Sequence, residues 1–203
     1  KYFVFIRELL KDSNTDIPEF LNEIIFYLGQ SFNFYFEDND GTCLFNGNHN
    51  LDTNEFKKYI KEYGYKFRNK FNSNGGYTIL KNKKDKIIVD LGPTPDKKYS
   101  ADYQSGALSF EIFHDKEKVI TNCGYFQNYN HKLNILSKST AAHSTLSIDD
   151  RSSCKFKKDK IGHFTLENNI KVTNKKIYHD DEIWEIQGVH DGYLKEYGIL
   201  HQR

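Results

Sequence analysis

The spacing of apolar residues changes along this 203-residue chain, and the change limits the folds open to it. Within residues 1–30 apolar residues recur every three or four positions, most clearly from Ile17 to Leu28, as on one face of a helix. From Phe32 to Phe36 the period is two, and from Gly76 onward short apolar runs alternate with polar turns. This order predicts helices followed by many short strands of an antiparallel sandwich.

Local signals predict the bounds of these elements. Asp16, followed by Pro18 and Glu19, is typical of a helix start, and Gly29 stands where a C-terminal cap is expected. Turn residues at 38–41 predict a hairpin with the flanking apolar residues, and a short helix is expected over residues 52–63. The expected strands lie at residues 77–80, 87–91, 107–113, 119–123, 145–148, 155–156, 163–166, 170–172, 183–189 and 193–200.

Composition excludes two classes of protein. The 29 basic and 28 acidic residues leave a net charge of +1, which removes the electrostatic case for nucleic-acid binding. No apolar run reaches the roughly 18–20 residues of a membrane span.

The three cysteines (Cys43, Cys123 and Cys154) are widely spaced and form no zinc-ribbon pattern. The chain has no methionine and begins within an apolar pattern, which predicts that an N-terminal part precedes Lys1.

Candidate chemistry gathers in four stretches, the last of which comprises residues 188–193 and 197–203 and contains His190 and His201. His143 lies among small residues, where an imidazole can be a ligand, a general base or a hydrogen-bonded core residue. Gln104 lies just ahead of an expected strand, and Asn122 lies on the strand that returns from it. No nucleophile elbow, zinc-protease motif or P-loop is present.

Several short motifs also occur in a particular order. They are Asp90-Leu-Gly, Gly106-Ala-Leu-Ser-Phe-Glu, Asn122-Cys-Gly, Ser139-Thr-Ala-Ala-His-Ser-Thr-Leu, Asp149-Asp, His190-Asp-Gly-Tyr and Gly198-Ile-Leu-His201-Gln-Arg203. In this order they resemble the C-terminal region of the heparinase II/III family of polysaccharide lyases. The resemblance covers residues 30–203 well, and the helices before it are similar in position to the end of that family's helical toroid.

The resemblance implies a mainly β architecture in two parts. Residues 1–30 would be a helical remnant of an α/α toroid. Residues 31–203 would be a large, supersandwich-like antiparallel β-sandwich that is C-terminally incomplete, with the sugar cleft between the two parts. The implied reaction is β-elimination on an acidic, uronate-containing polysaccharide such as a glycosaminoglycan. The catalytic tyrosine would lie on the missing toroid, upstream of Lys1, so the chain alone is expected to be inactive. The implied location is the periplasm or the cell exterior.

The resemblance also implies site residues. Some members of the family hold zinc at positions that match Gln104, Asn122 and His143. Neutral amides bind zinc more weakly than imidazole and carboxylate, so we expect zinc to be absent or loosely held and the three residues to form a polar cluster. His143 is expected to support catalysis, and Asp102, Tyr103 and Gln104 to contact substrate, with Asp102 at the place of a cleft histidine.

A second interpretation is a noncatalytic carbohydrate-binding or scaffolding sandwich. Aromatic side chains at Tyr125, Phe126, Tyr129 and Trp184 could stack on sugar faces. Trp184 lies in an apolar strand, however, so a place in the core is the simpler prediction for it.

Overall fold

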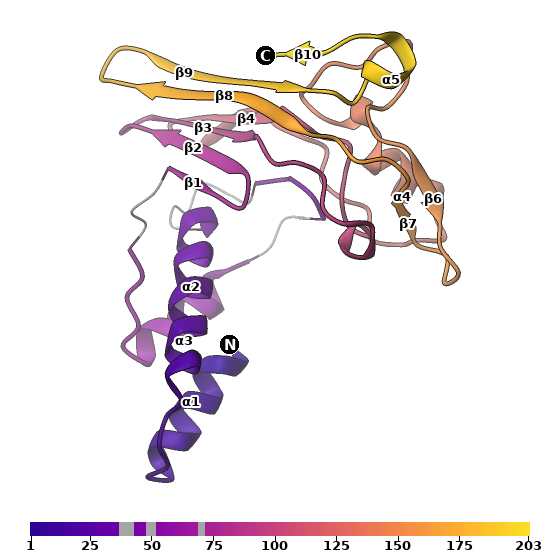
Figure 1. Ribbon diagram of the computed structural model, residues 1–203. Coiled ribbons are helices and arrows are strands. Elements are labelled where there is room, and N and C mark those ends of the chain that lie inside the picture. Colours follow the sequence, from indigo (N-terminus) through magenta and orange to yellow (C-terminus); the bar gives the residue numbers. More distant parts are fainter. Residues whose placement is uncertain (37–42, 48–51, 69–71) are drawn as a thin grey trace. The chain divides into compact units, whose positions relative to one another are not determined.

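The structure, a computed structural model, describes residues 1–36, 43–47, 52–68 and 72–203. These residues belong to two units. The helical unit comprises residues 1–41 and 51–71, and the sheet unit comprises residues 42–50 and 72–203 (Figure 1).

Among its described residues, the helical unit has three helices: α1 (Tyr2–Asp12), α2 (Glu19–Phe36) and α3 (Asn54–Glu62). Buried Val4 of α1 packs against Leu21 and Ile25 of α2, which confirms part of the apolar stripe expected there. Phe20 and Leu28, also expected in the stripe, are 59% and 53% exposed. Tyr2, Phe26 and Tyr27 remain 81%, 50% and 65% exposed, so much apolar surface on these helices lies uncovered in the described part of the chain. None of the described helices is long and apolar enough to cross a membrane.

The prediction of a hairpin after residue 30 is wrong for its first strand, residues 32–36. Phe32, Phe34 and Phe36 lie in the last turns of α2, because Phe32 and Phe36 are also four residues apart, the spacing that places two side chains on one helix face. Their rings lie 5.1 Å apart. Cys43–Phe45 lie in no strand, and the turn expected at residues 38–41 lies outside the described residues.

Gly29 also does not end the helix. It is buried within α2, and a Cβ there would lie 2.1 Å from the ring of Phe67. The glycine therefore serves close packing against Phe67 rather than capping.

Antiparallel sheets form the other unit. The first is five-stranded with the strands in sequence order, and a three-stranded and a two-stranded sheet follow. The strands are β1 (Ser73–Asn74), β2 (Tyr77–Lys81), β3 (Asp85–Asp90), β4 (Phe110–His114), β5 (Glu117–Ile120), β6 (Phe156–Lys158), β7 (Phe164–Leu166), β8 (Val172–His179), β9 (Trp184–His190) and β10 (His201–Gln202).

The β8–β9 hairpin lies beside the five-stranded sheet (Figure 1). Apolar residues fill part of the space between them, and Val89, Leu91, Leu108 and Val172 form a buried cluster there. In the described part of the chain the strands form several small sheets rather than one large sandwich. The expectation of a mainly β chain is thus correct for the antiparallel pairing, but too simple given the helices.

Some expected strands are wrong or displaced. Residues 145–148 form only an isolated bridge between Ile148 and Arg151. Residues 193–200 contain the helical turn α5 (Leu194–Tyr197), which ends at Gly198 with a φ of +69°. The strand expected from Ala107 begins only at Phe110, because Leu108 has a φ of +61° and leaves the extended conformation.

The sequence interpretation missed the helix α4 (Lys132–Lys138) and most of β8. Seven of the eight residues of β8 are exposed, and polar residues at 173–176 hide its alternation. β8 is an edge strand, and its register with β9 shifts between Thr173 and Lys176, around Asn174 with a φ of +49°.

Gly76 fixes the turn between β1 and β2. Its φ is +92°, and a Cβ there would lie 2.5 Å from the Cα of Gly92. Replacing Gly76 with alanine should therefore lower the free energy of unfolding by about 2–4 kcal/mol, through backbone strain and a forced separation of the two segments. Gly162, between β6 and β7, has a similar φ of +91° but open space around it, so Gly162→Ala should cost only about 1 kcal/mol. Urea unfolding would measure both, and equal losses would contradict the role of the contact.

Candidate functional site

The candidate site is built on the loop of residues 101–107, between η1 (Lys97–Tyr99) and β4. The Ser105 N–H donates to the Lys138 carbonyl at 2.8 Å, which ties the loop to the end of α4. A Cβ on Gly106 would lie only 3.4 Å from Cγ of His143, so the missing side chain lets the loop backbone lie against the imidazole.

Gln104 is fully buried and acts as a cross-link. Its side-chain Nε2 donates to the carbonyls of Gly124 and Ser137 at 2.9 and 2.6 Å, and its Oε1 accepts from the Gly47 N–H at 3.3 Å. Both amide donors and the amide oxygen therefore hold neighbouring backbone, and the side chain joins three segments of the sheet unit.

Asn122 is 2% exposed and holds the segment after His143. Its Oδ1 accepts from the backbone N–H and the hydroxyl of Ser144, at 3.0 and 3.3 Å. Its Nδ2 is buried without a described partner. Ser144 in turn accepts from the Phe110 N–H at 2.8 Å, so Asn122 and Ser144 join this segment to β4.

His143 follows the short helix η2 (Thr140–Ala142), with its Nε2 buried and without a described partner. Burial lowers the pKa of His143 to about 4, and the nearby Ser137 carbonyl offsets this only in part. The imidazole is therefore neutral near pH 7. It cannot supply a positive charge to a substrate carboxylate, although a neutral imidazole can still accept a proton.

The three side chains do not fit the zinc ion that the resemblance implies. The amide oxygens of Gln104 and Asn122 already accept hydrogen bonds from N–H or O–H groups. Neither residue is anionic, and no group of three His, Cys, Asp or Glu side chains in the described residues is placed to hold a metal ion. Gln104 is hydrogen-bonded to the backbone of Gly47 and Ser137, and Asn122 to the backbone of Ser144, rather than to each other.

Only one of the three residues expected to contact substrate exposes its side chain. Asp102 is exposed, whereas Tyr103 and Gln104 are 6% and 0% exposed. The Tyr103 hydroxyl is buried without a described partner. In this arrangement Asp102 is the member of the set that can reach a ligand directly.

Lys138 holds the backbone on both sides of Asp102, and the sequence interpretation missed this lysine. The fully buried Nζ donates to the carbonyls of Ala101 and Tyr103, on either side of Asp102, the second at 3.0 Å. It also lies 5.1 Å from the ring centre of Tyr125. Burial lowers the pKa of Lys138 to about 8. A lysine within a run of small residues was the available signal.

An apolar hollow of about 330 Å³ lies beside these residues. It is lined by Cys123, Gly124, Tyr125, Phe126, Leu133, Leu136, Ser137 and Ala142. Gly124 and Ser137 are the two carbonyl partners of Gln104, so the hollow lies next to that buried amide. Phe126 is 39% exposed, whereas Tyr125 is 9% exposed and belongs to the interior.

Asp90, at the end of β3, is a second buried charged residue that the sequence interpretation did not single out as a site. Its Oδ1 accepts from the Gly92 N–H at 2.9 Å, and its Oδ2 accepts from Asn46 Nδ2 at 3.2 Å. Burial raises the pKa of Asp90 to about 7. An acid within the apolar run of residues 87–91 was the signal that pointed to it.

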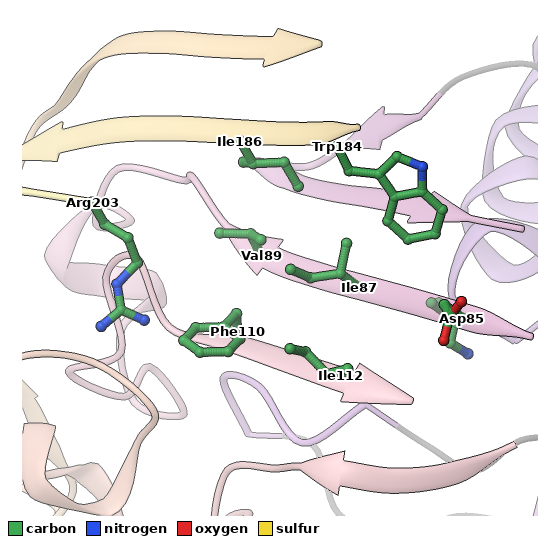
Figure 2. Close-up of a pocket in the computed structure, with 9 residues that line it drawn as sticks. Asp85, Ile87, Val89, Phe110, Ile112, Trp184, Ile186 and Arg203 are labelled. Carbon is green, nitrogen blue, oxygen red and sulfur yellow. The ribbon is translucent and has the colours of Figure 1, made fainter. Parts of the chain in front are cut away.

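A larger groove of about 490 Å³ lies between the five-stranded sheet and β9 (Figure 2). Its walls are Asp85, Lys86, Ile87, Val89, Phe110, Ile112, Trp184, Ile186 and Arg203. Trp184 is half-buried and faces this groove, so it is neither a fully enclosed core residue nor a free surface aromatic (Figure 2).

The arrangement of strands and helices is shared with solved polysaccharide lyases. The heparan sulfate lyase HepC from Pedobacter heparinus matches 99% of this chain with a TM-score of 0.67 and 16% identity. A heparinase III gene product matches 92% of it with a TM-score of 0.67 and 14% identity. The chain spans only 33% and 31% of the lengths of those two proteins. The shared feature is therefore the fold of one region of a lyase.

The sequence comparison is more specific. Residues 67–203 match the family described as heparinase II/III-like, C-terminal. The chain belongs to this family, which confirms the resemblance drawn from the motifs. No curated protein matches the sequence significantly.

Proposed function

We propose that this chain is the C-terminal part of a polysaccharide lyase that cleaves a uronate-containing polysaccharide, such as a glycosaminoglycan, by β-elimination. The family match over residues 67–203 is the observation that carries the proposal. In it, the helices α1, α2 and α3 are the end of an α/α toroid, and the sheets of residues 72–203 belong to a large β-sandwich. The boundary expected at residue 30 is moved, because α2 runs to Phe36 and α3 lies in the helical unit. The exposed apolar surface of α1 and α2 supports further helices as their partner.

The chemistry needs three groups. One must neutralise the uronate carboxylate, one must take the C5 proton, and one must protonate the leaving oxygen. The tyrosine that acts on the proton belongs, in this proposal, to the upstream toroid. Within this chain Asp102 would contact the sugar, and Gln104, Asn122 and Lys138 would position the loops around it. His143 would support the site as a neutral group.

A product assay tests the proposal. A longer protein that carries this chain with the upstream helices should release products with the ultraviolet absorbance of a 4,5-unsaturated uronate from at least one uronate polymer. The 203-residue chain alone should release none, because it lacks the group that removes the proton. The absence of such products from every uronate polymer offered to the longer protein would contradict a lyase. A periplasmic or secreted location is part of the proposal, and cell fractionation would test it.

The alternative is a noncatalytic carbohydrate-binding region. Exposed Phe126 and Tyr129, at 39% and 37%, support it, since exposed aromatic rings can stack on sugars. Binding of a polysaccharide by the longer protein without any unsaturated product would favour this function over the first.

A further inference from the structure

A buried pair of histidines joins the last strand of the chain to its neighbour. His190 of β9 and His201 of β10 lie directly opposite each other and are 1% and 6% exposed. Nδ1 of His201 lies 2.9 Å from Nε2 of His190. Neither residue has a role in the site described above.

The hydrogen bonds determine where the protons are. The Gly192 N–H donates to Nδ1 of His190 at 3.1 Å, so this nitrogen carries no proton. In the neutral ring the proton is then on Nε2, which donates to Nδ1 of His201. A second proton on His190 would be on Nδ1 and would face the Gly192 N–H. A proton on Nδ1 of His201 would face the Nε2–H of His190. Protonating either ring therefore breaks one hydrogen bond of the pair.

Two side chains next to this pair hold the segment that follows His143. Arg203 Nη1 donates to the Ser144 carbonyl at 2.8 Å, and the Tyr193 hydroxyl donates to the Leu146 carbonyl at 2.9 Å. Arg203 is two residues beyond His201, and the Tyr193 ring lies 5.7 Å from that of His190. Besides the bonds to Asn122 and β4, the placement of residues 144–146 thus depends on how β10 and the turn after β9 are held.

We propose that the His190–His201 pair is an acid-sensitive clasp that, through Arg203 and Tyr193, positions the Ser144–Leu146 segment beside His143. At neutral pH the clasp is closed. In acid it takes up a proton, loses a hydrogen bond, and releases β10 together with the segment. This concerns the fold around His143 and holds whether or not the longer protein is a lyase.

The surrounding charges agree with this direction. Burial and the neighbouring His201 lower the pKa of His190 to about 4, and Asp191 opposes the change. Burial and Arg203 lower the pKa of His201. β8 contributes the uncharged Val172 opposite His190. The folded pair thus binds protons less readily than the unfolded chain, in which histidine has a pKa of about 6.5. The contribution to stability is complete above that value and falls as the pH drops toward about 4.

Amide hydrogen exchange of the full chain tests the clasp. Between about pH 7.5 and about pH 5, protection factors of residues 144–146 and 201–203 should fall together, by roughly tenfold or more. The double variant His190→Asn/His201→Asn, which cannot take up these protons, should lose this dependence at residues 201–203 and keep at residues 144–146 only the smaller part that comes from buried His143. His179→Asn, a change on exposed β8, should keep it. Protection of residues 144–146 that does not change with pH, or that changes equally in the double variant, would overturn the proposal.

A second measurement uses the natural chain only, so it does not depend on the folding of a variant. Imidazole ¹⁵N shifts should show a proton on Nε2 of His190 and none on its Nδ1 at neutral pH. Both rings should titrate below the ordinary histidine pKa of about 6.5. The other tautomer at His190, or titration of either ring at or above that value, would overturn the clasp.

Discussion

The double variant Gln104→His/Asn122→Asp should bind zinc tighter than the natural chain by roughly three orders of magnitude. The change supplies an imidazole and a carboxylate in place of two amides, and His143 remains as the third ligand. Its Nε2 is buried without a described partner, so no protein hydrogen bond has to be broken there. Equilibrium dialysis with metal analysis would give the affinities and the stoichiometry.

Three controls make this test specific. Each single variant should gain less affinity than the pair, and adding His143→Ala to the pair should remove the gain. Without metal the double variant should be less stable by about 2 kcal/mol, because the two carbonyls that Gln104 holds lose their donors. Zinc should restore that stability. One equivalent of tightly held zinc in the natural chain would contradict the misfit described for its amides.

Replacing Glu111 with alanine should lower the free energy of unfolding by about 3–5 kcal/mol. The carboxylate, on β4, is fully buried. Oε1 accepts from the Thr121 hydroxyl at 2.8 Å and the Asn122 N–H at 2.9 Å, and Oε2 accepts from the Leu44 N–H at 3.2 Å. Lys118 Nζ lies 3.6 Å from Oε2. Truncation leaves the Asn122 N–H buried without its acceptor and removes the acceptor of the Leu44 N–H, so the loss exceeds that of one ordinary hydrogen bond.

Urea unfolding near pH 7 would measure this effect. Glu111→Gln should cost about 2–3 kcal/mol, because its amide nitrogen would point at another donor, either Leu44 N–H or Thr121 and Asn122. Glu117→Ala, on exposed β5, is the matched control and should change stability by less than about 0.5 kcal/mol. A loss below about 1 kcal/mol for Glu111→Ala would contradict the structural role of this carboxylate.

Strong periodic patterns predicted the fold where one face of an element is buried. The helices α1 and α2 and the strands β2, β3 and β9 follow the expected spacing closely. The pattern failed at Phe32–Phe36, where every second residue is aromatic and the same residues also match a helix face. It failed again at β8, whose residues face solvent and need no alternation.

The sequence pointed to residues of the candidate site but not to their contacts. The motifs pointed to Gln104, Asn122 and His143, and the loop at Gly106 brings two of these neighbourhoods together. The hydrogen bonds of a side-chain amide depend on backbone groups that are far away in the sequence. Gly47, for example, donates to Oε1 of Gln104. Spacing alone carries no such information, and for the same reason the buried charges of Lys138 and Asp90 were not recognised as important.

The irregular edge of β8 has a consequence for how molecules of this protein meet. An exposed edge strand offers free backbone groups on which another chain can add a strand, which is the first step of fibril growth. Here the register shift between Thr173 and Lys176 bends that edge, and Lys175 places a charge on it, whereas Lys176 pairs with Glu185 of β9 at 2.8 Å. This strand, the longest exposed one in the described part of the chain, is therefore a poor template for aggregation.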